Sequence, residues 1–373
     1  MRRIEWWQHI TTILVCGGPD SNRRTPAGTD PKSVTFDLAR QPPLAVNMSG
    51  VYFFSSRIGT ATIQQLYNSS SVEILMNLCP VCGEKFLDDE ISTISSHFYS
   101  IALSSDPTHI MWLNRNISKT KMQQYALNDK FTEFYDFSKE GLAMWIKKRF
   151  VARFFNDDPN VFVIDMQQPS EYTIMGYVTE HYHFLKQWVK SCAYILGRTD
   201  FSEIQKYEFD NISEEYFGKD GQPAHVDLLL QMGESVGLKK VEVISSVPLE
   251  KTVRALRYWD HVCSSEHWLD AMVSIHSLEL IADKNVKDYG AKYAYFKPEI
   301  LNDGITKEAV QFLKAGYEAD QYHSGDALKL IEKYARLLKM EREVQSYFLR
   351  SMDFFYGYLE ARHERGKMYE EKL

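Results

Sequence analysis

The sequence predicts a mainly α-helical protein, with an up-down helical bundle in its C-terminal half and a smaller mixed α+β domain before it. From Glu171 onward, apolar side chains recur at three- and four-residue spacing over long segments, as in helices that bury one face in a bundle. Before Glu171 the apolar runs are shorter and mixed in type. We therefore expect an extension over 1–47, a mixed domain over 48–168 and the bundle over 169–373.

The composition is typical of a globular protein and favours neither a nucleic-acid nor a membrane partner. Apolar residues make up 44% and charged residues 25% of the 373 positions, enough for two domains. The net charge of -7 offers no basic face for nucleic acid. No run of about 18 apolar residues could cross a bilayer. Five cysteines do not make a disulfide framework in a chain of this length, which favours the reducing cytoplasm.

The N-terminal extension lacks the periodicity of a helix or a strand. Residues 17–47 are rich in Pro, Gly, Ser and Asp. The stretch SNRRTPAGTDPKSVTFDLARQPP also resembles the conceptual translation of a non-coding stretch at a misplaced gene start, in which case Met48 begins the protein. We expect either a disordered tail or a spurious extension, and no chemistry from it in either case.

The mixed domain is predicted from short apolar runs that are followed by two helical patterns. The expected elements are strands at 51–56, 71–78 and 109–114 and helices at 120–137 and 139–155. A turn at 156–160 and a linker, QQPSE, with a capping serine end the domain.

The bundle is predicted as a series of amphipathic helices. They are expected at 171–197, at 202–216 with a continuation at 223–237, as one or two helices across 249–283, and at 284–297, 306–339 and 341–362. Thr306 is the predicted cap of its helix. Gly218, Gly221 and Pro223 interrupt the second helix in a stretch that no helix favours.

The stretch CPVCG at 79–83 is a candidate zinc knuckle. Its two cysteines have the spacing that presents both sulfurs to one zinc ion. No second Cys-x-x-Cys follows, and His97 and His109 lie downstream at a wider spacing than in the usual zinc finger. Two interpretations stay open: structural zinc at Cys79, Cys82, His97 and His109, or a pair of free cysteines in the core or a turn.

The helical half contains four couples of an acid and a histidine. They are Glu180 with His183, Glu214 or Glu215 with His225, His276 with Glu279, and Asp320 with His323. Facing helices with Glu-x-x-His couples can bind two irons, because the carboxylates neutralise the metals and the imidazoles complete each site. Each couple also has a structural interpretation, as a surface pair, a solvated turn, a satisfied core histidine or a packed polar seam.

Three segments resemble core helices of the heme-oxygenase-like di-iron oxidases, whose superfamily also holds pyrroloquinoline quinone synthase C and the thiaminase-II proteins (the PqqC-like and TenA-like proteins). YTIMGYVTEHYHFLKQW resembles the first core helix, NISEEYFGKDGQPAHVDLLLQMGESVGL the second and GYEADQYHSGDALKLI the last. The resemblance covers about residues 171–362 and implies a heme-oxygenase-like bundle. It leaves the first 170 residues unexplained.

The resemblance also implies a set of metal ligands. They are Glu180 from the first helix, Glu215 (or Glu214) and His225 from the second, Glu279 from the third, and Asp320 and His323 from the last. The family's last helix reads His-x-x-x-Asp-x-x-His, and the first of these positions is Gly316 here. One metal position should therefore be weak, absent or ligated from elsewhere. His276, one turn from Glu279, is the candidate replacement, and His183 is a further candidate ligand.

The function that the resemblance implies is a non-haem iron oxidase or oxygenase, with two irons of which one is weak. It would use dioxygen to oxidise a small amino-acid-like or carboxylic metabolite, with electrons from an unknown donor, and a homodimer is a candidate assembly. One alternative is an oxidase that works without metal, like pyrroloquinoline quinone synthase C, with His225 and His323 moving protons. The other is a non-catalytic binding protein that has kept the bundle and lost the site.

Overall fold

The computed structural model describes residues 77–372, except for 89, 104, 219–220, 222 and 304, and except for the side chains of 103, 303 and 317–324. The predicted extension over 1–47, the strand at 51–56 and most of the strand at 71–78 lie outside the described residues. All described residues belong to one compact unit, Val72–Leu373.

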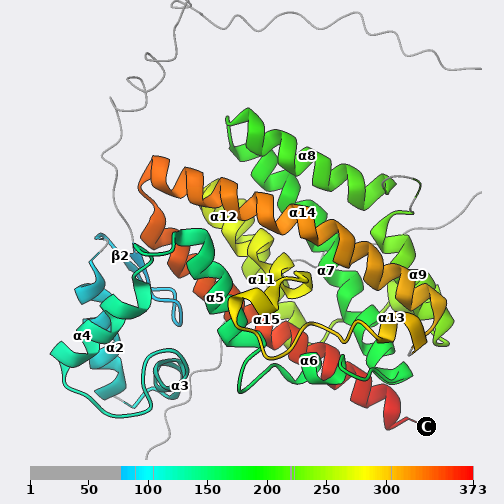
Figure 1. Cartoon of the computed structure of the whole chain (residues 1–373), viewed down its shortest axis with the longest axis horizontal. Coiled ribbons are helices and arrows are strands. Elements are labelled where there is room, and N and C mark those ends of the chain that lie inside the picture. Colours follow the sequence, from blue (N-terminus) through cyan, green and yellow to red (C-terminus); the bar gives the residue numbers. More distant parts are fainter. Residues whose placement is uncertain are drawn as a thin grey trace, which may run out of the picture. The chain divides into compact units, whose positions relative to one another are not determined.

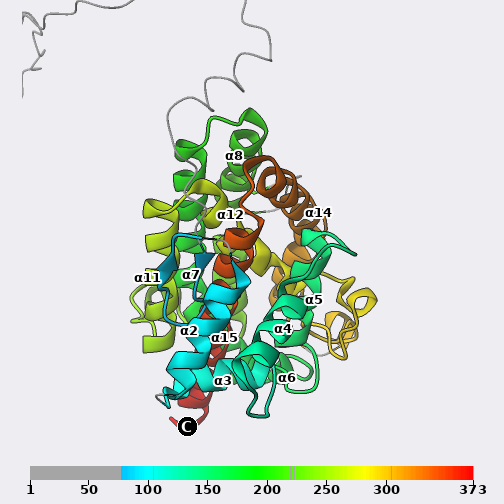
Figure 2. The same cartoon turned by 90° about the vertical axis from the view of Figure 1, so that its left-hand side faces the viewer.

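A short hairpin and a group of helices precede the bundle. The elements are β1 (Asn77–Leu78), β2 (Lys85–Phe86), α2 (Ile91–Leu103), α3 (Pro107–Asn116), α4 (Gln124–Tyr135), α5 (Leu142–Phe154) and α6 (Val161–Asp165). The two strands are antiparallel, with Asn77 opposite Phe86. Helix α2 packs against α3 and α4, and the three are seen together in Figure 2.

The predicted strand at 109–114 is wrong, because this segment belongs to helix α3. Pro107 occupies the first turn, where its missing N–H removes no helical hydrogen bond. The side chain of Asp106 caps the helix by accepting a hydrogen bond from the backbone N of His109, 2.9 Å away. These start signals outweigh the strand preference of the bulky residues that follow.

The bundle follows the predicted order of helices. Its elements are α7 (Glu171–Arg198), α8 (Ser202–Phe217), α9 (His225–Ser235), α10 (Lys240–Ile244), α11 (Glu250–Ser265), α12 (Trp268–His276), α13 (Ile300–Asp303), α14 (Lys307–Leu338) and α15 (Glu341–Glu370), with 3-10 helices η1 (Ser277–Ala282) and η2 (Val286–Tyr289). Ser170 and Thr306 cap α7 and α14 as predicted. None of the described helices is both long and apolar enough to span a bilayer.

The predicted helix at 284–297 is wrong, because only the short η2 forms there. Gly290, with a φ of 94°, ends η2 in the left-handed conformation. The backbone N–H groups of Lys292 and Tyr293 then both donate to the carbonyl O of Phe155, at 2.9 and 3.2 Å. This segment is therefore held by the end of α5 instead of by helical hydrogen bonds of its own.

Helices α7 and α15 form the central pair of the bundle (Figure 1). Gly176 and Gly366 permit their close approach: a Cβ on Gly176 would lie 2.3 Å from the backbone O of Arg362, where no side chain fits. The pair carries His181 and Arg362 into contact, with 2.8 Å between Nδ1 and Nη2. Helices α5 and α6 and strand β1 also contact α15. The domain boundary near residue 168 stays a prediction.

Candidate metal and ligand sites

A cavity of about 120 Å³ lies inside the bundle and gathers several of the predicted ligands. Its polar lining consists of His181, Asn211, Glu214, Glu215, His225, Glu279 and Arg362, together with the backbone position Gly316. Aromatic and aliphatic side chains form the rest, among them Phe184, Leu185, Trp188, Leu278, Ile281, Phe296 and Phe312. The cavity thus joins oxygen and nitrogen donors to an apolar space, as small-molecule sites do.

Glu215 and His225 meet across the break between α8 and α9. The Nδ1 atom of His225 lies 2.8 Å from Oε1 of Glu215. Gly218 ends α8 with a φ of 72° and Gly221 also has a positive φ of 81°, conformations that glycine adopts readily. The Gly- and Pro-bearing stretch therefore turns the chain so that an acid and a histidine ten residues apart come together.

His276 lies fully buried between two carboxylates. Its Nδ1 is 2.7 Å from Oε1 of Glu279, and its Nε2 is 2.8 Å from Oε1 of Glu208. Burial lowers the pKa of His276, but the two carboxylates outweigh it and raise the pKa to about 10. His276 is therefore an imidazolium at neutral pH, and it holds Glu279 at the cavity wall.

Glu208 is a residue of this cluster that the sequence analysis missed. It is fully buried, and one of its carboxylate oxygens and a nitrogen of His276 lie within 4.8 Å of the thiol of Cys192 on α7. The spacing of seven residues between Glu208 and Glu215 places both on one face of α8, and this signal could have found it. Among the described residues, the second oxygens of Glu208 and Glu279 are buried without a hydrogen-bond partner. Both of these oxygens therefore remain available to coordinate a cation.

The structure does not bring Glu180 or His183 to the cavity. Glu180 is buried and accepts hydrogen bonds from Nε of Arg365 at 2.7 Å and from the backbone N of Leu249 at 3.1 Å. His183 lies 2.9 Å from the hydroxyl of Ser246. Their neighbour His181 is the histidine of α7 that lines the cavity.

The predicted ligands of the last helix lie on α14. Residues 320 and 323 are helical, but the side chains of Asp320 and His323 are outside the described part of the chain. Gly316, one turn before Asp320, lines the cavity. A Cβ added at Gly316 would meet no described heavy atom within 4 Å, so the position has room for a larger residue.

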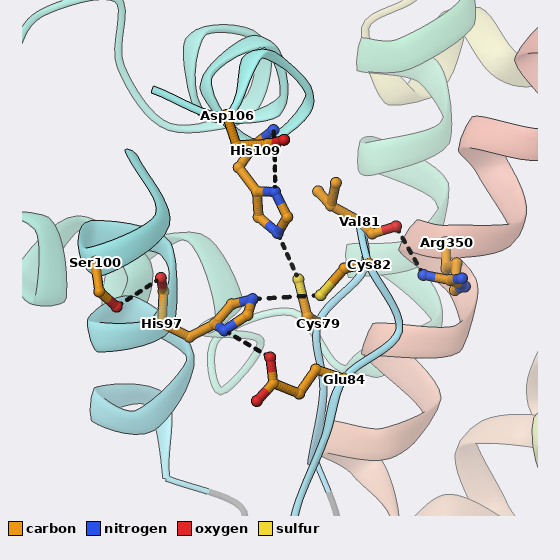
Figure 3. Close-up of polar contacts among 9 residues, drawn as sticks. All are labelled: Cys79, Val81, Cys82, Glu84, His97, Ser100, Asp106, His109 and Arg350. Atoms are coloured by element: carbon orange, nitrogen blue, oxygen red, sulfur yellow. Dashed lines mark hydrogen bonds and ion pairs between the residues drawn. The ribbon is translucent and has the colours of Figure 1, made fainter. Parts of the chain in front are cut away.

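The knuckle brings its four predicted zinc ligands together (Figure 3). The Sγ of Cys79 lies 3.5 Å from Nε2 of His109, and the Sγ of Cys82 lies 3.4 Å from Nε2 of His97. All four ligand atoms lie within 4.8 Å of one another. Zinc bonds of about 2.3 Å to sulfur and about 2.0–2.1 Å to nitrogen place tetrahedral S and N ligands about 3.5–3.6 Å apart, so the set fits zinc.

Both histidines of the knuckle are oriented by carboxylates through their second ring nitrogen. Asp106 lies 2.7 Å from Nδ1 of His109, and Glu84 lies 3.2 Å from Nδ1 of His97 (Figure 3). Zinc-bound histidines commonly have such partners, which fix the ring and leave Nε2 for the metal. Arg350 of α15 donates to the carbonyl O of Val81 at 2.8 Å and so fastens the knuckle to the bundle.

The family match decides what kind of bundle this is. Residues 161–365, more than half of the chain, match the TENA/THI-4/PQQC family. The chain belongs to this family. Membership confirms the predicted superfamily and its heme-oxygenase-like bundle, and it supports an enzyme-like or ligand-binding role. Residues 76–136 match a C2H2 type zinc-finger, which together with the four clustered ligands supports metal binding by the knuckle.

Several solved structures resemble this chain at low sequence identity. A TenA homolog from Pseudomonas syringae pv. tomato has 15% identity over 60% of this chain and 90% of its own, with a TM-score of 0.44. A domain of unknown function with a heme oxygenase-like fold from Shewanella denitrificans has 14% identity over 67% and 96%, with a TM-score of 0.46. A CADD-like protein from Nostoc punctiforme has 15% identity over 63% and 93%, with a TM-score of 0.38. No curated protein matches the chain.

Proposed function

We propose that this protein is a non-haem iron oxidase or oxygenase whose bundle cavity holds the metal. The proposal rests on one observation above all. Glu215 and His225 meet across a helix break, and Glu279 lines the same cavity. Carboxylate oxygens and imidazole nitrogens of this kind suit iron(II), and a largely apolar wall suits a small organic substrate. Bound iron would supply the activation of dioxygen.

The proposed ligands are Glu215, His225 and Glu279, with Asp320 and His323 added by the family resemblance. Glu214 also lines the cavity and is the alternative carboxylate of α8. One oxygen of Glu279 accepts a hydrogen bond from His276, which fixes the carboxylate. The other oxygen is left to coordinate the metal. His276 is thus proposed as a positioning residue, in the way that outer hydrogen-bond partners orient metal ligands.

Glu180 is left out of the proposed ligand set because both of its oxygens are already engaged. The guanidinium of Arg365 and the backbone N of Leu249 each donate to one of them. Ligation of a metal would require this buried carboxylate to leave a charged partner, which is costly. Glu208 has one buried oxygen with no hydrogen-bond partner among the described residues, but it does not line the cavity, so it is proposed to act on the site through His276.

We also propose that the knuckle binds one structural zinc ion through Cys79, Cys82, His97 and His109. The four ligands come from the turn between β1 and β2, from α2 and from α3. A zinc ion with four protein ligands has no open position for chemistry, and its binding energy contributes to folding. The site would hold the hairpin, α2 and α3 together.

Metal analysis with an oxygen assay tests the proposed function. The full chain is loaded anaerobically with iron(II), dialysed, and analysed for iron and zinc by mass spectrometry, and oxygen uptake is then followed with candidate carboxylic substrates. One or two irons with oxygen uptake supports the proposal. No iron with continued uptake supports a metal-free oxidase. No iron and no uptake supports a binding protein, for which the glycine at position 316 would be the explanation.

A further inference from the structure

Arg362 is a buried cation at the cavity wall that has no acidic partner in the described part of the chain. It projects from α15, is 2% exposed and lines the cavity. Its Nη1 donates to the hydroxyl of Tyr295 at 2.6 Å, and its Nη2 donates to the hydroxyl of Tyr358 at 2.6 Å and to Nδ1 of His181 at 2.8 Å. Its Nε is buried and, among the described residues, has no hydrogen-bond partner.

The partners of Arg362 are all neutral at physiological pH. Burial lowers the pKa of His181 well below its usual value, and the guanidinium lowers it further, so this imidazole accepts a hydrogen bond without carrying charge. The phenols of Tyr295 and Tyr358 are uncharged groups at neutral pH. The guanidinium of Arg362 is therefore hydrogen-bonded, but no carboxylate among the described residues balances its positive charge.

Two other arginines of the chain show what the usual arrangement is. Arg365, one turn further along α15, pairs with the carboxylate of Glu180 at 2.7 Å. Arg153 of α5 is also buried and lies 3.4 Å from Asp353. Arg362 is the most deeply buried of the three, and buried charges are normally paired because removing them from water is costly. The cation–π contact with Tyr177, at 4.2 Å from the ring centroid, offsets only part of that cost.

We propose that Arg362 recognises the carboxylate of a small monocarboxylic ligand in this cavity. A guanidinium matches the planar carboxylate in shape and charge. One unbalanced positive charge balances one negative charge, which favours a monocarboxylate over a doubly charged phosphate. Two of the three described acids of the cavity wall, Glu215 and Glu279, repel such a ligand less than free carboxylates would, because each is hydrogen-bonded to a histidine.

The size and lining of the cavity limit the rest of the ligand. A volume of about 120 Å³ is slightly below that of an engineered apolar cavity of about 150 Å³ that holds benzene. A ligand that fills it therefore has about six non-hydrogen atoms, the carboxylate included. Leu185, Leu278 and Ile281 line the space, so the part of the ligand beyond the carboxylate is apolar. The identification of this ligand as the substrate rests on the proposed function, whereas its binding does not require iron.

Paired acids and amides of the same shape test the inference on the full chain. Acetate, propionate and isobutyrate are titrated into the metal-free protein by calorimetry, each beside its uncharged amide. We expect at least one acid to bind at least about tenfold more tightly than its amide, as a charge-assisted hydrogen bond predicts. Binding of none of the three acids, or equal affinity for acid and amide throughout, overturns the inference.

Two variants assign the preference to the arginine. In Arg362→Met the preference for the acid should disappear, because the cation is gone while most of the side-chain volume remains. Tyr358→Phe removes one neutral partner and keeps the charge, so it should retain the preference even if Arg362→Met does not fold. Arg254→Met, at an exposed position of α11, is the control and should behave as wild type. An Arg362→Met protein that still prefers the acid contradicts the inference.

The same titration separates this inference from the proposed function. If the acid binds the metal-free protein selectively but the chain takes up no iron, the carboxylate site stands and the iron oxidase does not. If iron is bound but no acid is preferred over its amide, the iron site stands and the role of Arg362 is refuted.

Discussion

The knuckle and the cavity both contain histidines, but they combine them with different partners and in different geometries. In the knuckle, two thiols and two imidazoles converge until a sulfur lies 3.4 or 3.5 Å from a nitrogen, which leaves no open position around a cation. In the cavity, carboxylates and imidazoles stand around a space of about 120 Å³ and are held by one another. A closed set of four ligands is typical of structural zinc, and an open set is typical of reactive metals. The comparison teaches that ligand type and geometry together separate the two roles: sulfur and nitrogen ligands close around one ion, and oxygen and nitrogen ligands surround an open space.

The largest effect is expected from breaking the closed site. Cys79→Ser should reduce bound zinc from about one ion per chain to none, because a serine hydroxyl does not replace a thiolate ligand. The hairpin, α2 and α3 should then become sensitive to limited proteolysis. Iron uptake by the bundle should not change, because the two sites share no ligand.

Cys263→Ser is the matched control, since Cys263 is a buried free cysteine far from the knuckle in the sequence. It should keep its zinc. Loss of iron together with zinc in Cys79→Ser would show that the two regions share a metal site, contrary to the comparison drawn above.

The second effect is expected at the open site. His225→Ala should weaken iron binding by well over tenfold, since even changes to outer partners of a ligand cost about 10–100-fold. His183→Ala is the control, because its ring is bonded to Ser246 and does not line the cavity. Iron titration followed by mass spectrometry measures both, and circular dichroism verifies that the helices persist. Equal affinity in His225→Ala and His183→Ala contradicts the proposed ligand role.

A third, smaller effect on iron binding is expected from replacing Glu208, a partner of His276. Glu208→Gln keeps the size of the side chain but removes a negative charge beside the imidazolium, so His276 should hold Glu279 less firmly. Iron affinity should fall by about tenfold, at the lower end of the range for outer partners. Glu203→Gln, on the same helix but bonded to Lys333 and Tyr334, should leave it unchanged. Wild-type iron affinity in Glu208→Gln would contradict a role for Glu208 and His276 in positioning Glu279.

The smallest expected effect is a gain in iron affinity. Gly316→His restores the family's last-helix pattern at a position where a Cβ meets no described atom within 4 Å. It should tighten the weaker iron position severalfold and stabilise the helix by up to about 1 kcal/mol, because glycine is a poor helix former. Gly316→Ala is the control, since it adds the helix stability without the ligand. If both variants bind iron like wild type, position 316 has no role in metal binding.

Much of the fold could be predicted because helix periodicity and caps are local signals. Ser170 and Thr306 start α7 and α14 where the sequence places them. The segment 109–114 was wrongly predicted as a strand because its bulky residues suggest one, while the deciding signals, Asp106 and Pro107, lie just before it. The prediction of a helix at 284–297 was also wrong, because the backbone of this segment is held by Phe155, more than a hundred residues away.

The site could be predicted only where its contacts are close in the sequence. Glu215 and His225 are ten residues apart, and the helix breaker between them indicates the turn. The hydrogen bond from Arg365 to Glu180 joins residues 185 positions apart, and no local sequence pattern indicates it. Arg362 was missed for a related reason: an arginine near the end of an amphipathic helix is usually exposed, and only the tertiary packing shows that it is buried.

Anomalous X-ray diffraction from one crystal of the iron- and zinc-loaded chain tests the central claim most directly. Data collected on both sides of the zinc and iron absorption edges locate each element separately. The account predicts a zinc peak among Cys79, Cys82, His97 and His109, and an iron peak in the cavity beside Glu215, His225 and Glu279. Zinc in both places, or no iron peak in the cavity of a crystal grown with excess iron(II), would contradict the division into a closed structural site and an open reactive one.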